Sequence, residues 1–183
     1  MLAKEINIPF DNNEWIFEIK WDGYRAISEI DNGEVKLYSR NGNSFIITYP
    51  LIVAELKKIK HNVVLDGEVV FLNEEGLSDF QKLQHYEDNT QFPICYYVFD
   101  ILELDGKKTT KLPLIKRKQL LKQVISKNAV IKYSDHIVGK GKEFFKAAQH
   151  KNLEGIIAKK ADSEYHVGSR TGEWLKIKHH KSE

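Results

Sequence analysis

Apolar and polar side chains alternate along the first forty residues, which is the pattern of half-buried strands. The alternation predicts strands over residues 15–21, 24–30 and 34–39. Asp22-Gly23 is a turn signal, so we expect a hairpin there, and Asp31-Asn32-Gly33 predicts a second turn. Lys20 therefore falls near the end of the first strand, before a tight turn, and shares a strand face with Glu18.

The remainder of the chain mixes helical and strand patterns. Helical spacing of apolar residues predicts helices over 50–59, 78–85, 113–125 and 142–150. Further strands are expected over 63–72, 94–104, 129–133, 155–159 and 174–178. Ser78 is the expected N-cap of the short second helix. The run 94–104 suits a central strand buried on both faces, and Asp66-Gly67 predicts a bulge. Without repeats or linkers, one α+β domain fits best.

Composition places the chain among globular proteins. It has 183 residues, of which 42% are hydrophobic and 30% charged. No apolar run approaches the roughly 20 residues that span a bilayer, and the first residues lack a signal-peptide core. We therefore expect no membrane association and a cytoplasmic location. The single Cys95 lies in an apolar run, which predicts a buried thiol.

Charge is distributed unevenly between the two parts of the chain. Residues 1–105 hold 9 Lys+Arg against 19 Asp+Glu, whereas residues 106–183 hold 19 against 7. These local charges of −10 and +12 combine to the formal net charge of +2. A basic half suits a polyanion such as nucleic acid or nucleotide phosphates, although a solvated basic surface has the same composition.

Several side chains could carry chemistry. Lys20 could act as a nucleophile at its strand end, although a surface lysine in a hairpin is an equally good interpretation. Lys176 and Lys178 share a face of a predicted strand. Two like charges side by side indicate either an anion bound between them or an exposed edge strand. Asp66 and Glu68 share a face of an apolar strand, where carboxylates are costly unless they bind something. No Gly-x-x-x-x-Gly-Lys-Ser/Thr loop is present, which excludes a P-loop ATPase.

These residues resemble, in order, the motifs of the covalent nucleotidyltransferases, which include ATP-dependent DNA ligases, RNA ligases and capping enzymes. Lys20 lies in a Lys-x-Asp-Gly-x-Arg motif. The other matching segments are Ser39–Gly42, Asp66–Glu68, Val98–Asp100, Glu154–Lys159 and Trp174–Lys178. Phe80–Gln84 and Phe99–Gly106 additionally match the bacterial end-joining ligases of the ligase D type. The chain is thus identified as a member of the ATP-dependent DNA ligase family, as its adenylation domain.

The resemblance implies a role for each matching residue. Lys20 would attack the α-phosphate of ATP and carry AMP covalently, with Lys176 and Lys178 beside that phosphate. Glu68 and Glu154 would hold Mg²⁺ or Mn²⁺. Nucleotide contacts would come from Glu18 at the adenine amino group, from Phe99 stacked on the purine (Tyr97 is the alternative), and from Arg25, Arg40, Glu68 and Lys159. Arg170, in a basic loop similar to one of the ligase D type, would touch DNA.

The resemblance also implies a fold, partners and a pathway. The expected fold is an ATP-grasp-like nucleotidyltransferase domain over residues 1–183, with antiparallel sheets flanked by helices and the nucleotide pocket between them. The implied partners are nicked or broken DNA, in repair and end joining near the bacterial nucleoid, and an OB-type domain absent from this sequence. We therefore expect a monomer that holds AMP but seals nicks poorly. An RNA ligase or capping-type enzyme, and an inactive nucleotide- or nucleic-acid-binding module, are the alternatives.

Overall fold

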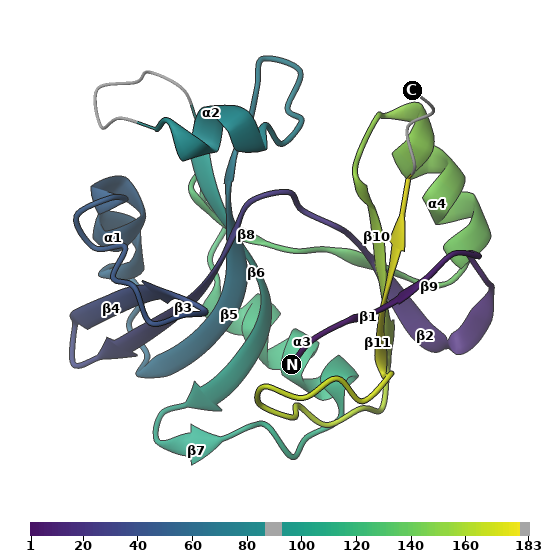
Figure 1. Ribbon diagram of the computed structural model, residues 1–183. Helices are drawn as coiled ribbons and strands as arrows, with labels where there is room; N and C mark the ends of the chain where they lie inside the picture. Colours follow the sequence, from purple (N-terminus) through teal and green to yellow (C-terminus); the bar gives the residue numbers. More distant parts are fainter. Residues whose placement is uncertain (87–92, 180–183) are drawn as a thin grey trace. The chain divides into compact units, whose positions relative to one another are not determined.

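The computed structural model describes residues 1–86 and 93–179, which form two sheets and four helices (Figure 1). The chain divides into two compact units, and it passes between them more than once. Unit 1 comprises Met1–Trp21, Lys111–Ile115 and Ser134–Glu183. Unit 2 comprises Asp22–Thr110 and Lys116–Tyr133. This architecture is the expected α+β class.

Unit 1 is built on a five-stranded sheet in the order β1-β11-β10-β2-β9. Its strands are β1 (Lys4–Ile6), β2 (Asn12–Ile19), β9 (His136–Gly139), β10 (Gly155–Lys160) and β11 (Trp174–Lys178). β1 runs parallel to β11, and the other pairs are antiparallel. Helix α4 (Gly141–His150) packs on one face, where Phe17, Ile156 and Ile177 have no exposed surface. The opposite face of the sheet carries the charged residues predicted for the site.

Unit 2 is built on a six-stranded sheet in the order β4-β3-β5-β6-β7, with β8 paired in parallel to β6. Its strands are β3 (Tyr24–Asp31), β4 (Glu34–Ser39), β5 (Val63–Phe71), β6 (Ile94–Leu104), β7 (Lys107–Lys108) and β8 (Ile131–Tyr133). Its helices are α1 (Pro50–Leu56), α2 (Phe80–Gln84) and most of α3 (Leu114–Val124). Leu65, Tyr96 and Ile101 lie in the core with no exposed surface.

Most predicted elements are present, and three strands have the predicted bounds: 34–39, 94–104 and 174–178. Asp66-Gly67 does coincide with a register shift between β5 and β6. Cys95 is confirmed as buried, with 1% of its surface exposed. The sequence patterns missed β1, β7 and β9, each of four residues or fewer and too short for an alternating pattern to register.

The hairpin predicted at Asp22-Gly23 is wrong, because β2 and β3 belong to different sheets. A two-residue hairpin turn needs a positive φ, and neither residue has one. Gly23 instead lies directly against β5, where a Cβ would stand 2.0 Å from the Val69 carbonyl oxygen. The glycine therefore serves a close backbone approach that leads the chain into unit 2.

Two helix predictions need smaller corrections. Asp79, not Ser78, caps α2, since its side chain accepts a hydrogen bond from the Lys82 backbone amide. Helix α1 ends at Leu56, before Ile59. No helix among the described residues is long and apolar enough to cross a membrane.

Candidate active site

The candidate residues of unit 1 gather on the sheet face opposite α4. Directly paired residues of neighbouring strands share a face, and Glu18, Ile157, Lys176 and Glu5 pair in one row across β2, β10, β11 and β1. Strand alternation adds Lys159, Trp174 and Lys178 to the same face. The structure thus brings together most of the residues that the sequence predicted in this unit.

Lys20 lies one residue beyond β2 and forms an ion pair with Glu154. Its backbone amide donates to the Gly155 carbonyl at 3.0 Å, so strand pairing fixes its backbone. Its Nζ lies 2.5 Å from Glu154 Oε1, with 20% of the Lys20 side chain exposed. The attraction between the carboxylate and the ammonium holds the two side chains against each other.

Lys176 and Lys178 share a single carboxylate. Glu5 Oε2 lies 3.0 Å from the Nζ of Lys176 and 3.4 Å from that of Lys178. Hydrogen bonds to the two ammonium groups, Lys176 foremost, lower the pKa of Glu5 below its ordinary value. The like charges predicted on this strand therefore do have an anion between them, and the chain itself supplies it.

Glu18 belongs to a buried network. Its Oε2 accepts hydrogen bonds from Lys159 Nζ at 3.1 Å and from Ser134 Oγ at 3.2 Å. Trp21 Nε1 in turn donates to Ser134 Oγ at 3.2 Å, and Lys159 Nζ lies 4.2 Å from the centre of the Trp174 ring. Only 3% of the Lys159 side chain is exposed, so its ammonium is held against Glu18 inside the protein.

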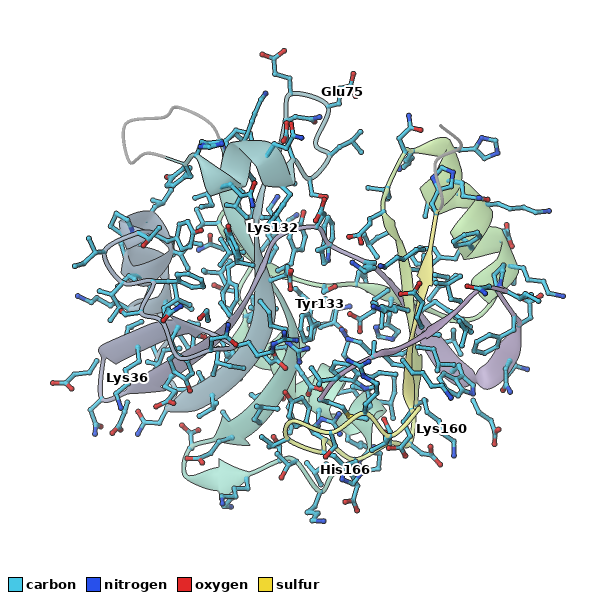
Figure 2. All side chains as sticks on the ribbon, in the orientation of Figure 1. Lys36, Glu75, Lys132, Tyr133, Lys160 and His166 are labelled. Atoms are coloured by element: carbon cyan, nitrogen blue, oxygen red, sulfur yellow. The ribbon has the colours of Figure 1, made fainter. Side chains whose placement is uncertain are left out.

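The candidate residues of unit 2 also share a sheet face. Arg25, Glu68 and Tyr97 pair in one row across β3, β5 and β6. Arg40 follows β4 directly, and it lines a cavity of about 290 Å³ together with Arg25 and Glu68. Lys132, labelled in Figure 2, extends the row on β8, where its Nζ lies 5.7 Å from the centre of the Tyr97 ring.

Arg25 is held by a buried carboxylate. Its Nε and Nη2 donate to the two oxygens of Asp66 at 2.9 and 2.6 Å, a bidentate arrangement that fixes the guanidinium plane. The guanidinium carbon also lies 5.2 Å from the centre of the Phe99 ring. Phe99 is 9% exposed and occupies the register shift of β6, between the residues paired with Gly67 and Asp66.

The two carboxylates predicted to bind metal lie in different units, Glu154 in unit 1 and Glu68 in unit 2. Glu154 Oε2 is buried and has no hydrogen-bond partner among the described residues, so a hard cation would suit it. Within residues 1–86 and 93–179, no three His, Cys, Asp or Glu side chains form a metal-binding group.

Arg170 is exposed on the segment between β10 and β11. Sequence reasoning missed Glu5 and Ser134, which contact predicted site residues. Glu5 lies in a three-residue strand, and Ser134 follows β8 by one residue, so neither belongs to a pattern long enough to identify it. Only contacts between residues distant in sequence reveal them.

The fold and these side chains define a class of protein, a nucleotidyltransferase domain with a lysine at its site. The family model described as "ATP dependent DNA ligase domain" matches residues 1–178. The chain therefore belongs to the ATP-dependent DNA ligase domain family, and its relatives place it with the ligase D type.

Relatives match nearly the whole chain. The multifunctional non-homologous end joining protein LigD of Mycolicibacterium smegmatis is 36% identical over 180 residues, which are 97% of this chain and 23% of that protein. A DNA ligase-like protein, LigB, of Bacillus subtilis is 34% identical over 97% of this chain and 66% of its own length. This chain thus spans about a quarter of the LigD relatives.

A solved structure of mycobacterial DNA ligase D complexed with ATP and MES superposes with a TM-score of 0.88 at 33% identity. The match covers 97% of this chain and 59% of that chain. The ligase domain of Mycobacterium tuberculosis LigD gives a TM-score of 0.83 at the same identity. The nucleotidyltransferase fold expected from sequence is confirmed.

Proposed function

We propose that this chain is the adenylation domain of an ATP-dependent DNA ligase and that Lys20 is its nucleophile. The observation that carries the proposal is the position of Lys20 on unit 1, 2.5 Å from Glu154 and beside a sheet face that holds Lys176 and Lys178. A nucleophile, an adjacent proton acceptor and cations for a phosphate are the groups that nucleotidyl transfer requires.

The reaction begins with loss of a proton from the Lys20 ammonium. Glu154 Oε1 is the acceptor already in hydrogen-bond reach. The freed lone pair of Nζ attacks the α-phosphorus of ATP and forms a nitrogen–phosphorus bond. The bond from that phosphorus to the bridging oxygen breaks, and pyrophosphate leaves with the electron pair. AMP remains on Lys20.

The remaining residues bind and orient the nucleotide. Lys176 and Lys178 neutralise charge on the α-phosphate, a stabilisation that grows as the phosphoryl group rearranges. Glu18 accepts a hydrogen bond from the adenine amino group, and Lys159 holds the Glu18 carboxylate in place. In unit 2, Arg25, Arg40 and Glu68 contact the sugar and phosphates, and Phe99 stacks on the purine.

Glu154 in unit 1, and separately Glu68 in unit 2, would each offer a carboxylate oxygen to a divalent cation, Mg²⁺ or Mn²⁺. When bound, such a cation neutralises phosphate charge. Glu154 suits this role because its Oε1 holds Lys20 while its Oε2 is buried without a hydrogen-bond partner in the described part of the chain.

We further propose that AMP passes from Lys20 to the 5′-phosphate of nicked or broken DNA, after which a 3′-hydroxyl displaces it. Arg170 would contact the DNA backbone, since it is exposed and permanently charged. The LigD and LigB relatives are longer than this chain, and an OB-type domain is the partner that we propose for the sealing steps.

The test is the intact mass of the purified protein before and after incubation with ATP and Mg²⁺. A gain of one AMP less one water is expected, and it should be absent from Lys20→Ala. Lys160→Ala is the matched control, because Lys160 (labelled in Figure 2) follows Lys159 on β10 and so lies on the opposite face of the sheet. A gain that persists in Lys20→Ala would overturn the assignment of the nucleophile.

Substrate class is tested with the same protein. GTP in place of ATP should give no mass gain, and lysyl-AMP protein should transfer AMP to nicked DNA in preference to nicked RNA. Efficient labelling by GTP would favour a capping-type enzyme, and preferential transfer to RNA would favour an RNA ligase.

A further inference from the structure

The proposed function places the α-phosphate between the ammonium groups of Lys176 and Lys178. In the structure, the Glu5 carboxylate occupies that position. We propose that Glu5 is an internal counter-ion of the phosphate-binding lysines, and that an incoming nucleotide phosphate displaces it. This inference rests on the proposed function and adds a residue that competes with the substrate.

The geometry is that of a shared anion. One oxygen of Glu5 contacts both ammonium groups, at 3.0 Å from Lys176 and 3.4 Å from Lys178. A phosphate oxygen would make the same two contacts from the same position. Glu5 faces Lys176 directly across the parallel β1–β11 pairing, so the contact follows from the sheet register.

The backbone that carries Glu5 is well anchored. β1 is paired in register with β11, and the Leu2 amide donates to the Ser169 carbonyl at 2.8 Å. The Met1 side chain is 3% exposed. Displacement therefore requires only rotation of the Glu5 side chain, and β1 can stay in the sheet.

Exposure distinguishes this ion pair from its neighbour on the same face. The side chains of Glu5, Lys176 and Lys178 are 41%, 27% and 35% exposed, so water can replace each contact as it breaks. The Lys159–Glu18 pair is only 3% and 2% exposed, and breaking it would leave buried charges. Exposed ion pairs contribute little free energy, so the Glu5 contacts are the ones a ligand can displace.

The charge difference sets the direction of the exchange. A nucleotide phosphate brings more negative charge and more acceptor oxygens to the two lysines than one carboxylate does. It therefore displaces the Glu5 carboxylate from its position between them. Glu5 still opposes binding, because each nucleotide must first break its two contacts. Removing the negative charge of Glu5 should therefore tighten the binding of phosphate-bearing ligands.

The experiment compares ligand binding by calorimetry in a Lys20→Ala background, where no covalent product forms. Glu5→Gln should bind ATP about threefold to tenfold more tightly than its parent, the range expected for two exposed ion pairs. Glu143→Gln is the matched control, since Glu143 lies on α4 with 80% of its side chain exposed and loses the same charge. Adenosine, which lacks phosphate, should bind equally to all three proteins.

Replacing both lysines by glutamine should abolish the effect of Glu5→Gln. Inorganic pyrophosphate serves as a second anion probe. Equal or weaker binding of both ATP and pyrophosphate by Glu5→Gln, relative to Glu143→Gln, would overturn the proposal. A parallel change in adenosine affinity would also overturn it, because the effect would then be structural. Failure of the proposed function is seen separately, as absence of the mass gain in protein with Lys20 intact.

Discussion

Glu154 combines two properties that one carboxylate rarely has. One oxygen holds the Lys20 ammonium at 2.5 Å, and the other is buried without a hydrogen-bond partner among residues 1–86 and 93–179. A buried acceptor without a partner costs free energy, which a bound cation would offset. We propose that Glu154 accepts the lysine proton through Oε1 and, while still charged, offers Oε2 to a cation.

Glu154→Gln should slow formation of the lysyl-AMP product at least about a hundredfold, because a neutral amide can neither accept the proton nor bind a cation strongly. The measurement is the single-turnover rate of AMP attachment at saturating ATP. Glu143→Gln should keep the parental rate. A Glu154→Gln rate within a few-fold of the parent would remove Glu154 from the chemistry.

Gly155 fixes the position of the carboxylate of Glu154, the residue that precedes it. Its φ is +152°, and a Cβ there would stand 2.1 Å from the Ile177 carbonyl oxygen on β11. Backbone atoms cannot yield as a flexible side chain does, so any larger residue must push β10 away from β11.

Gly155→Ala should therefore destabilise the protein by about 3 kcal/mol, the combined cost of overpacking and backbone strain. Gly168→Ala is the control, because Gly168 has a φ of +68° with nothing within 4 Å of the added Cβ, and should lose about 1 kcal/mol. Urea unfolding measures both. Equal losses of unfolding free energy in the two variants would mean that the backbone shifts enough to remove the clash with Ile177.

Strand alternation alone predicted that Glu18 and Lys20 share a face, as do Lys176 and Lys178, and the strand pairing joins the two sets. It could not predict Glu5, because the relevant contact depends on which strand lies beside β11. That choice is made by tertiary pairing across most of the chain length, which no local pattern encodes.

Among the elements, β6 and α3 are joined by a fully buried ion pair. Arg117 Nε and Nη2 donate to the two oxygens of Asp100 at 2.7 and 3.0 Å, and neither side chain has exposed surface. Asp100 Oδ1 also accepts from the Ile101 amide at 2.9 Å. Asp100 follows Phe99 directly in β6, so the ion pair fixes the strand that carries the proposed purine-stacking residue.

Arg117→Met should destabilise the protein by about 3 to 5 kcal/mol, because Asp100 would remain buried and unpaired. The double variant Asp100→Leu, Arg117→Met should recover most of that loss, since no buried charge then remains. Arg40→Met, at an exposed arginine, should change stability by no more than about 0.5 kcal/mol. Denaturant unfolding monitored by circular dichroism is the measurement. A double variant no more stable than Arg117→Met would contradict this account.

The element boundaries of β4, β6 and β11 follow from their sequences because each has a clear apolar pattern with turn residues beyond it. The partner of each strand could not be predicted from the sequence of that strand. Asp22-Gly23 has the composition of a hairpin turn, and only the contact of Gly23 with β5 shows that it connects two sheets.

At the scale of the whole molecule, two units arise from a chain that alternates between them, so no linker marks their boundary. The sequence patterns therefore predict one α+β domain. Composition and periodicity describe single elements, whereas division into units depends on which elements pack together. The charge asymmetry between the two parts of the sequence likewise does not follow the division, since both units draw on early and late residues.

Stability should fall at alkaline pH through tyrosines of unit 2. Burial, with the hydrogen bond that Tyr38 donates to Glu29, raises the pKa of Tyr38 from 10.0 to about 12, and burial raises that of Tyr97 equally. The neutral forms are thus favoured in the folded state. Their stabilising contribution is complete below pH 10, the unfolded value, and is lost as pH rises towards 12.

Urea midpoints measured between pH 7 and pH 11.5 should stay level to about pH 9 and then decline. Tyr38→Phe should show a shallower decline above pH 10 than the parent, because one ionising group has been removed. Parallel declines would show that Tyr38 does not contribute to the loss.

The buried thiol of Cys95 and the tryptophans have a practical consequence. Cys95, the only cysteine, lies in unit 2, whereas Trp15, Trp21 and Trp174 all lie in unit 1. Burial raises the pKa of the Cys95 thiol, so a labelling reagent should react only when unit 2 opens. Indole fluorescence reports on unit 1 alone. The unaltered chain thus carries a separate spectroscopic and chemical reporter for each half, and the response of either half to nucleotide can be followed without engineered labels.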